Sequence, residues 1–433
     1  MYKKYLFLSA VFAVTFLLFP LFMSSQPVTQ PEAGLTGEPA RQVAEHPVLD
    51  FNIPPLLMPY METAPELRSR AAVMIDVETG TVIFAENPHM EIPPASLTKL
   101  MTMHLVKRAV ADGHFSLDDV VPFGEESWAE NQPPRSSLMF LGPGQVVTMR
   151  EIMIGLAVPS GNDAAVAAAV HVSSTVEDFV HEMNLEAQRM GLSSTRFVEP
   201  SGVSPYNMTT AADFAAFSRE YVRLHPQSLT DFHSIRNFAF PTASHMLPGY
   251  HPRVIVQNNN NTLLRLFPGT DGLKTGFIGA SGFNIALTAE RDHTRFVTVI
   301  LGAPAVAGGA RIREADGNDL FGWAFENFRT VRPFIENIEP VRLWKGSDDN
   351  ARLVAAGSKS FTSPVSRSNS LWYYVELNGP LVAPVPAGYH AGYLVLIDSI
   401  GEVNRVPLVT AEAHDSGSAF RRFWHSIRLA FER

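Results

Sequence analysis

The chain has 433 residues, more than one ordinary domain needs, and therefore predicts two or three domains. Its formal net charge of -9 argues against a general nucleic-acid binder, because phosphate binding needs a basic surface. The absence of cysteine excludes disulfides, thiolate metal sites and a cysteine nucleophile.

The N-terminal segment predicts export. Lys3 and Lys4 precede an apolar run from Tyr5 to Met23, the pattern of a secretory signal. We expect cleavage near residues 24–26, so that residues 1–25 are a signal peptide. The alternative is a retained anchor, because the run is long enough to cross a bilayer. Either outcome places the rest of the chain outside the cytoplasm.

The next stretch, residues 26–65, is rich in proline and has neither a helical nor a strand period, which predicts a flexible or extended tether. Order is expected from about Arg70. The predicted elements are strands at 72–77 and 81–85, helices dominating 96–224, strands at 284–289 and 295–301, and a helix at 311–328. This order predicts an α+β domain over residues 66–332, in which an antiparallel sheet carries a helical insertion.

Beyond Pro333 and Pro340 the pattern changes to short β-rich runs separated by glycine, proline and asparagine. These runs lie at 342–344, 370–377 and 393–398. They predict a small all-β domain, a sandwich, over residues 335–413.

The last segment, residues 418–433, predicts an amphipathic helix. Its apolar face consists of Phe420, Phe423, Trp424, Ile427 and Phe431. Arginines lie off that face, an arrangement that suits an anionic membrane surface. The alternative is a helix packed on its own domain.

Three short motifs carry the candidate chemistry, and the first is Ser96-Leu97-Thr98-Lys99. A helix that opens at Ser96 would project Ser96 and Lys99 from one face. The serine needs a base, and a lysine can be that base only when burial or a neighbouring cation keeps it neutral. Backbone N–H groups at the helix start could also bind an oxyanion. Taken alone, the motif fits a helix N-cap as well.

The second motif, Ser160-Gly161-Asn162, could turn tightly and point a hydroxyl and an amide into one cleft. The third motif spans Asp271 to Gly276. Within it, Lys274 and Thr275 on a strand could bind a carboxylate, while Gly276 leaves room for a peptide backbone. Alone, the second also fits a polar loop and the third a hairpin. Together, Ser-x-x-Lys and Lys-Thr-Gly form a known serine acyl-transferase set.

These motifs resemble those of the low-molecular-mass penicillin-binding proteins, the serine D-Ala-D-Ala carboxypeptidases. The resemblance covers about residues 70–330, and the β-rich tail and terminal helix look like that family's second domain and membrane anchor. It rests on residues 93–102, 160–165, 183–184, 190–192, 195, 197 and 271–276. It implies a transpeptidase/β-lactamase-like domain, with an antiparallel sheet and a helical cluster, followed by a β-sandwich.

The resemblance implies four catalytic residues. Ser96 would be the acylated nucleophile and Lys99 its general base. Ser160 would relay a proton, and Asn162 would hold Lys99 and the substrate amide. No metal or cofactor is implied.

It also implies a substrate-binding set on the third motif. Lys274 and Thr275 would take the terminal carboxylate of the peptide, with Arg313 nearby. Gly276 belongs to the same strand motif, and the backbone N–H groups of Phe277 and the nucleophile would form the oxyanion hole.

The implied function is removal of the last D-Ala from peptidoglycan pentapeptides at the periplasmic face of the inner membrane, with β-lactams as inhibitors. The alternatives are a D,D-endopeptidase, a β-lactamase, or a cell-wall binding protein with an inactive site. A β-lactamase of this fold usually needs a glutamate that activates water, and the central block has no convincing Glu-x-x-Leu-Asn segment. The intact motifs argue against an inactive site.

Three segments depart from the family's usual pattern. The run from Asn258 to Asn261 stands where members often have an arginine, Glu199-Pro200-Ser201-Gly202 replaces Asn-Pro-x-Gly, and Phe277 to Ala280 replaces a threonine-containing turn. We expect these changes to alter contacts with the substrate and to leave the pair of Ser96 and Lys99 intact.

Overall fold

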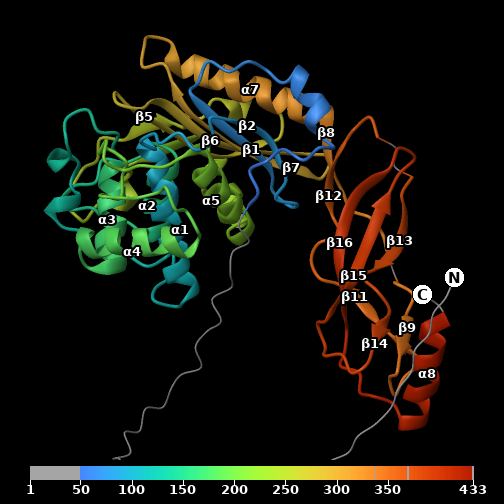
Figure 1. Cartoon of the computed structure of the whole chain (residues 1–433). Helices are drawn as coiled ribbons and strands as arrows, with labels where there is room; N and C mark the ends of the chain where they lie inside the picture. The colour runs from blue at the N-terminus through green and yellow to red at the C-terminus, as the bar shows by residue number, and fades with distance from the viewer. Residues whose placement is uncertain (1–48, 336, 368–369, 432–433) are drawn as a thin grey trace, which may run out of the picture. The chain divides into compact units, whose positions relative to one another are not determined.

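The computed structural model describes residues 49–335, 337–367 and 370–431 (Figure 1). The predicted signal peptide and the predicted tether up to residue 48 lie outside the described residues. The tether prediction is wrong for its last part. Residues Met58–Thr63 form the 3-10 helix η1, Leu57 is fully buried, and Trp323 Nε1 donates to Thr63 Oγ1 over 3.3 Å. Ile53, Leu56, Tyr60 and Met61 are partly buried against the same core as Leu57.

A five-stranded antiparallel sheet forms the centre of the first region. Its strand order is β2-β1-β7-β6-β5. The strands are β1 (Ala71–Asp76), β2 (Val82–Glu86), β5 (Thr270–Ile278), β6 (Gly282–Arg291) and β7 (Thr294–Ala303). The four strands predicted at 72–77, 81–85, 284–289 and 295–301 are confirmed, and they pair as the antiparallel hairpins β1–β2 and β6–β7.

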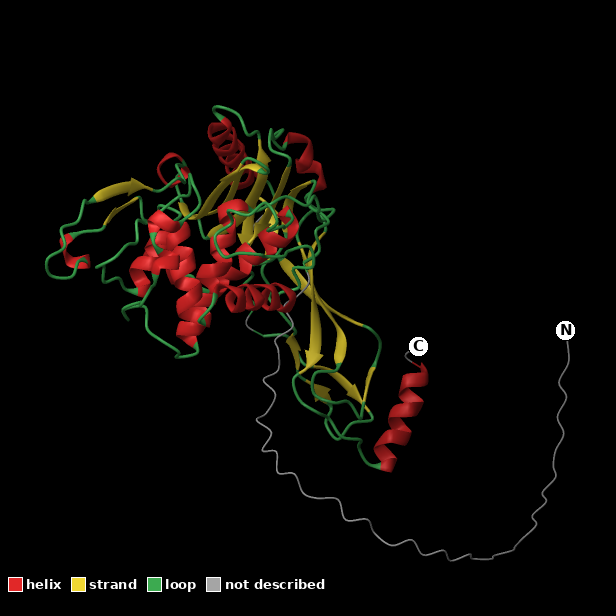
Figure 2. Ribbon diagram, turned by 90° about the vertical axis from the view of Figure 1, so that its left-hand side faces the viewer, coloured by secondary structure: helices red, strands yellow, loops and turns green. Residues whose placement is uncertain are grey.

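Both faces of this sheet are buried, because successive strand residues point to opposite sides. On β1, Ala72 and Met74 belong to a core with helix α7 (Gly309–Asn327), whereas Val73 and Ile75 belong to the core beneath the other helices. Figures 1 and 2 show α7 on one face and the helical cluster on the other. The α+β prediction is confirmed.

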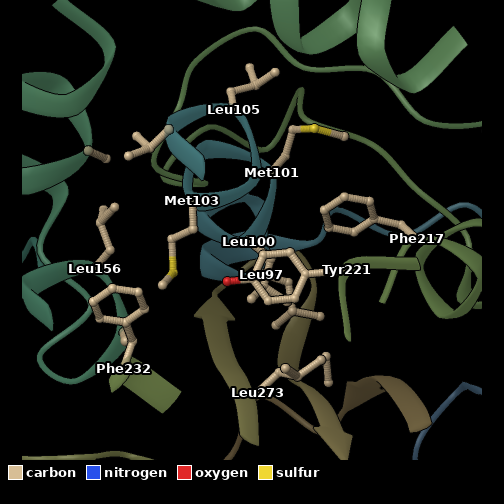
Figure 3. Packing of buried hydrophobic residues seen from close by; sticks show 14 of the residues in the cluster. Leu97, Leu100, Met101, Met103, Leu105, Leu156, Phe217, Tyr221, Phe232 and Leu273 are labelled. Carbon is tan, nitrogen blue, oxygen red and sulfur yellow. The ribbon is translucent and has the colours of Figure 1, made fainter. Parts of the chain in front are cut away.

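The helical cluster packs around the helix that follows the first motif. It comprises α1 (Lys99–Ala111), α2 (Met149–Ala157), α3 (Asn162–Ser173), α4 (Val176–Arg189) and α5 (Ala211–Leu224). Figure 3 shows side chains from several elements meeting around α1: Leu97, Leu100, Met103, Leu156, Phe232 and Leu273. Leu273 comes from β5, so this core fixes α1 against the strand that carries the third motif.

The stretch predicted as mainly helical contains long loops. Between α1 and α2 the only helical pieces in the described chain are the 3-10 turns η3 (Glu125–Ser127) and η4 (Ala129–Asn131). The remaining elements of this region are η2 (Ala95–Thr98), the π-helical turn η5 (Leu229–His233), β3 (Asn237–Phe240), η6 (Ala243–His245), β4 (Ile255–Asn258), α6 (Leu263–Leu266) and β8 (Phe328–Val331).

The C-terminal β-rich region is a sandwich, as predicted. Its strands are β9 (Val341–Trp344), β10 (Asn350–Ala351), β11 (Leu353–Ala355), β12 (Phe361–Pro364), β13 (Trp372–Leu377), β14 (Leu381–Val382), β15 (His390–Ile397) and β16 (Glu402–Thr410). The sheet β10-β9-β14 and the sheet β11-β16-β15-β13 share one apolar core, which includes Leu343 from the first and Leu394 and Leu408 from the second. Strand β12 pairs with β8, so the chain crosses between the two predicted domain ranges.

The C-terminal helix α8 spans Ala419–Phe431, and none of its residues is buried. Phe420, Phe423, Trp424 and Phe431 are exposed, whereas His425 Nδ1 accepts a hydrogen bond from Lys345 N over 2.8 Å. Among the described residues, no helix combines the length and apolar character needed to span a membrane.

Candidate active site

Ser96 and Lys99 lie one turn apart at the start of the central helix. Ser96 belongs to η2, and the chain continues from it directly into α1 at Lys99. This geometry places Lys99 Nζ 3.2 Å from Ser96 Oγ. A serine hydroxyl and a candidate base are therefore within hydrogen-bond reach.

The Lys99 amine is fully buried and has two further partners. It donates to Asn162 Oδ1 over 2.8 Å and to the Ser201 carbonyl over 2.6 Å. Burial lowers the pKa of Lys99 to about 7, although the negative charges of Glu199 and Asp163 oppose this shift. A substantial fraction of the amine is therefore neutral near neutral pH.

The second motif faces the same place from a tight turn. Ser160 has a left-handed φ of 65°, and its buried Oγ has no hydrogen-bond partner within the described residues. Asn162 opens α3, and its Nδ2 donates to Ser136 Oγ over 3.1 Å. Asp163 accepts from the backbone N–H groups of residues 139, 140 and 141 at 2.8, 2.7 and 3.0 Å. The carboxylate of Asp163 thus ties a neighbouring loop to this turn.

Strand β5 brings the third motif against the nucleophile. A Cβ at Gly276 would lie 2.9 Å from the Pro94 carbonyl oxygen and 3.0 Å from Ser96 N, so only glycine permits this approach without displacement. Lys274 is buried, and its Nζ donates to the Thr275 carbonyl over 3.2 Å. Burial and the nearby charges of Lys99 and Arg313 hold the pKa of Lys274 well below its usual value.

Arg313 reaches the site from α7 and is almost completely buried. Its Nη2 donates to Glu314 Oε1 over 3.2 Å, while its Nε has no partner among the described residues. Burial lowers the pKa of Arg313, and Glu314 partly restores it. The guanidinium remains cationic, because the unperturbed pKa of arginine is so high.

A cavity of about 580 Å³ joins these elements. The predicted residues that line it are Ser96, Ser160, Thr275, Gly276, Phe277 and Arg313. Lys99, Asn162 and Lys274 are buried close to the lining: Lys99 contacts Ser96, Asn162 contacts Lys99, and Lys274 contacts the Thr275 carbonyl. The structure thus gathers all nine predicted site residues in one place.

Several residues of the site were missed in the sequence. Arg135 and Arg265 line the cavity, and so do Asn258 and Asn260 from the asparagine run. Asn259 also lines the cavity, although most of its side chain is buried. Asn261 is a buried support, and its Nδ2 donates to the Gly272 carbonyl over 3.1 Å, near the start of the third motif. The asparagine run was singled out in the sequence as a departure expected to alter substrate contacts, whereas nothing local in the sequence marked Arg135 or Arg265.

The expectation for Glu199 was wrong. We expected this departure to affect the substrate side, but its carboxylate does not line the cavity. It accepts hydrogen bonds from Ser201 N and Gly202 N, both over 2.7 Å, in the turn whose carbonyl contacts Lys99. Within the described residues, no group of three or more histidine or acidic side chains is arranged to hold a metal ion.

Comparisons with known proteins identify the family. Residues 58–305 match the family of D-alanyl-D-alanine carboxypeptidases known as peptidase S11. The chain belongs to this D-alanyl-D-alanine carboxypeptidase family. It is 32% identical to the D-alanyl-D-alanine carboxypeptidase DacD of Escherichia coli over 371 residues, covering 84% of this chain and 92% of that protein.

Solved structures of penicillin-binding proteins share the fold. Penicillin-binding protein 5 of Haemophilus influenzae superposes with a TM-score of 0.73 and 30% identity, over 81% of this chain and 99% of that chain. Penicillin-binding protein 6B of Escherichia coli superposes with a TM-score of 0.65 and 30% identity, over 84% of this chain and 100% of that chain. The predicted fold class is confirmed. The carboxypeptidase is a serine-type hydrolase that acts in cell-wall peptidoglycan metabolism.

Proposed function

We propose that the carboxypeptidase removes the terminal D-Ala of peptidoglycan stem peptides through an acyl-enzyme on Ser96. The observation that carries this proposal is the 3.2 Å separation between Ser96 Oγ and the buried amine of Lys99. A neutral amine donates two hydrogen bonds, to Asn162 and Ser201, and keeps its lone pair for the proton of Ser96. Lys99 is then the general base.

The reaction proceeds in two steps, acylation of Ser96 and deacylation by water. Ser96 Oγ forms a bond to the carbonyl carbon of the penultimate D-Ala, its proton passes to Lys99, and the peptide C–N bond breaks. The departing D-Ala nitrogen takes this proton from Lys99 through Ser160, whose Oγ is buried and unpartnered within the described chain. Water then cleaves the ester and restores the free serine. Backbone N–H groups of Ser96 and Phe277 stabilise the oxyanion in both steps.

Recognition of the C-terminal carboxylate falls to Lys274, Thr275 and Arg313. Lys274 and Arg313 are buried basic side chains with few anionic partners, and Thr275 and Arg313 line the cavity. An arriving carboxylate favours the protonated form of Lys274, because an opposite charge raises the pKa of an amine. The positive site is therefore completed by the substrate.

The test is acylation and product release. Labelled penicillin mimics the dipeptide amide, and a penicillin-binding protein of Listeria monocytogenes has been solved in a cefotaxime-bound form. Mass spectrometry should find the adduct on the wild type and none on Ser96→Ala; an unchanged adduct on Ser96→Ala refutes the assignment. Release of D-alanine from a pentapeptide is expected, whereas preferential cleavage of a cross-linked dimer would indicate an endopeptidase.

We also propose a periplasmic location at the inner membrane, with residues 66–332 as the catalytic domain, 335–413 as the β-rich domain and 418–433 as a membrane-associating helix. Support comes from the exposed aromatic face of α8 and from Arg422 and Arg428, which are exposed on that helix. Aromatic side chains with neighbouring arginines suit an interface with anionic lipid.

Deletion of residues 418–433 should release the carboxypeptidase from anionic vesicles. Replacing Phe420, Phe423 and Trp424 by serine should do the same while leaving penicillin acylation unchanged. Continued vesicle binding by both variants would contradict the assignment to α8.

A further inference from the structure

A glutamate outside the three motifs, Glu199, belongs to the turn whose carbonyl contacts the catalytic base. Lys99 Nζ makes its shortest hydrogen bond, 2.6 Å, to the carbonyl of Ser201. A backbone carbonyl can hold an amine in place only if its own turn is fixed. The groups that fix this turn therefore determine the position of the base.

Glu199 fixes this turn from within. Its Oε2 accepts from Ser201 N over 2.7 Å and from Ser201 Oγ over 2.5 Å. Its Oε1 accepts from Gly202 N over 2.7 Å, Ser204 N over 3.3 Å and Asn207 Nδ2 over 2.9 Å. One carboxylate thus gathers five donors, and charge-assisted bonds of this kind are stronger than neutral ones.

The same turn is joined to the nucleophile's own segment. The Pro200 carbonyl accepts from Thr102 Oγ1 over 2.7 Å, and Asn207 Nδ2 donates to Thr98 Oγ1 over 3.1 Å. Gly202 has a φ of 85°, and a Cβ there would lie 1.8 Å from the Ala95 carbonyl oxygen. The turn is thus packed directly on the backbone that precedes Ser96.

We propose that Glu199 is a positioning residue of the catalytic base: its carboxylate holds the Ser201 carbonyl on the Lys99 amine, and its negative charge acts on that amine through space. This inference rests on the proposed acyl-enzyme mechanism. The charged groups around Lys99 are Glu199 in the turn, Asp163 on α3 and Lys274 on β5. Lys274 repels a charged Lys99, and the two carboxylates favour it.

Glu199 does not itself act on water or substrate. It is absent from the residues that line the cavity, and both carboxylate oxygens are directed at donors of the turn. A role in orienting Lys99 and a role as a direct base for deacylation make different kinetic predictions.

The test is the pH profile of penicillin acylation and deacylation in Glu199→Gln. Loss of the carboxylate removes a charge that raises the pKa of Lys99. The acid limb of the acylation rate constant should therefore move to lower pH, by about one unit. The plateau should fall roughly 10- to 100-fold, because the Ser201 carbonyl is less firmly held. Glu199→Asp keeps the charge and should keep the acid limb in place.

Glu151→Gln is the matched control. Glu151 is also a partly buried carboxylate that accepts several hydrogen bonds, from Thr148 N, Thr148 Oγ1 and His245, but it caps α2 and does not line the cavity. This variant should be less stable and should retain the wild-type acid limb.

Two outcomes would overturn the inference. One is a folded Glu199→Gln enzyme whose acid limb coincides with that of the wild type. The other is slow deacylation with unchanged acylation, which would make Glu199 a direct participant. If the wild-type enzyme itself forms no adduct on Ser96, the proposed mechanism fails instead, so the two failures are distinguishable.

Discussion

The catalytic region and the described part of the C-terminal β-rich region differ in whether they bury lysine and arginine side chains. The first buries Lys99, Lys274 and Arg313 close together with few anionic partners. In the described part of the second, no lysine or arginine is buried, and the shared core consists of side chains such as Leu343 and Leu394. Burying an uncompensated charge opposes folding. The catalytic region therefore accepts a loss of stability where the chemistry requires a neutral amine and a waiting cation.

The largest expected effect is that of Lys99→Arg, which replaces the neutral buried amine of the catalytic region with a permanent cation. Arginine stays protonated, so it cannot take the proton of Ser96. Penicillin acylation should fall roughly 1000-fold, measured by stopped-flow or adduct mass. Lys107→Arg, on the same helix and only partly buried, is the control and should acylate normally. A Lys99→Arg enzyme whose penicillin acylation rate is within tenfold of the wild-type rate would contradict the role of Lys99 as the base.

Next is Lys274→Met, which separates function from stability. Hydrolysis of a peptide ending in D-Ala-D-Ala should lose about 100-fold in kcat/KM, because the carboxylate loses a charged partner. The unfolding midpoint should stay the same or rise, since a buried amine with few hydrogen-bond or anionic partners is replaced by an apolar side chain. Steady-state kinetics and calorimetry measure the two quantities. A lower unfolding midpoint together with an unchanged kcat/KM would mean that Lys274 stabilises the fold and does not bind the substrate.

Leu394→Ala addresses the β-rich region alone. Leu394 is fully buried in the sandwich core, so its truncation should cost about 3 kcal/mol in the stability of that region. Acylation of Ser96 should be unchanged at 25 °C, because none of the cavity-lining residues comes from this region. Denaturant unfolding measures the stability and penicillin labelling measures the acylation of Ser96. A loss of acylation together with the loss of stability would contradict this prediction.

The smallest expected effect is that of Arg405→Met. Arg405 pairs with Glu376 and Glu402 at 3.0 Å on an exposed sheet face. Exposed pairs of this kind contribute little, so the unfolding midpoint should not change within error at physiological salt. A clear loss would mean that surface ion pairs stabilise the β-rich region more than its apolar core suggests.

Local patterns in the sequence predicted the strands β1, β2, β6 and β7 and the C-terminal sandwich, because these depend on period and turn chemistry. The roles of the nine site residues came from the resemblance of the short motifs to a known family. Contacts that depend on distant backbone could not be predicted. The Ser201 carbonyl that holds Lys99 is separated from it by 102 residues, and nothing in its side chain indicates that role. The same holds for Arg265, which is one exposed arginine among many until α6 places it at the cavity. The burial of Leu57 was missed because the proline-rich stretch around it has no helical or strand period from which a buried face could be predicted.

The central claim is that a neutral Lys99 takes the proton of Ser96, and the pH dependence of acylation tests it most directly. Burial lowers the pKa of Lys99 to about 7, so the base is protonated below that pH and free above it. The second-order rate constant for penicillin acylation should therefore rise with pH, with its midpoint near that value. A rate constant that stays flat across this range, in an enzyme that still forms the adduct on Ser96, would contradict the claim.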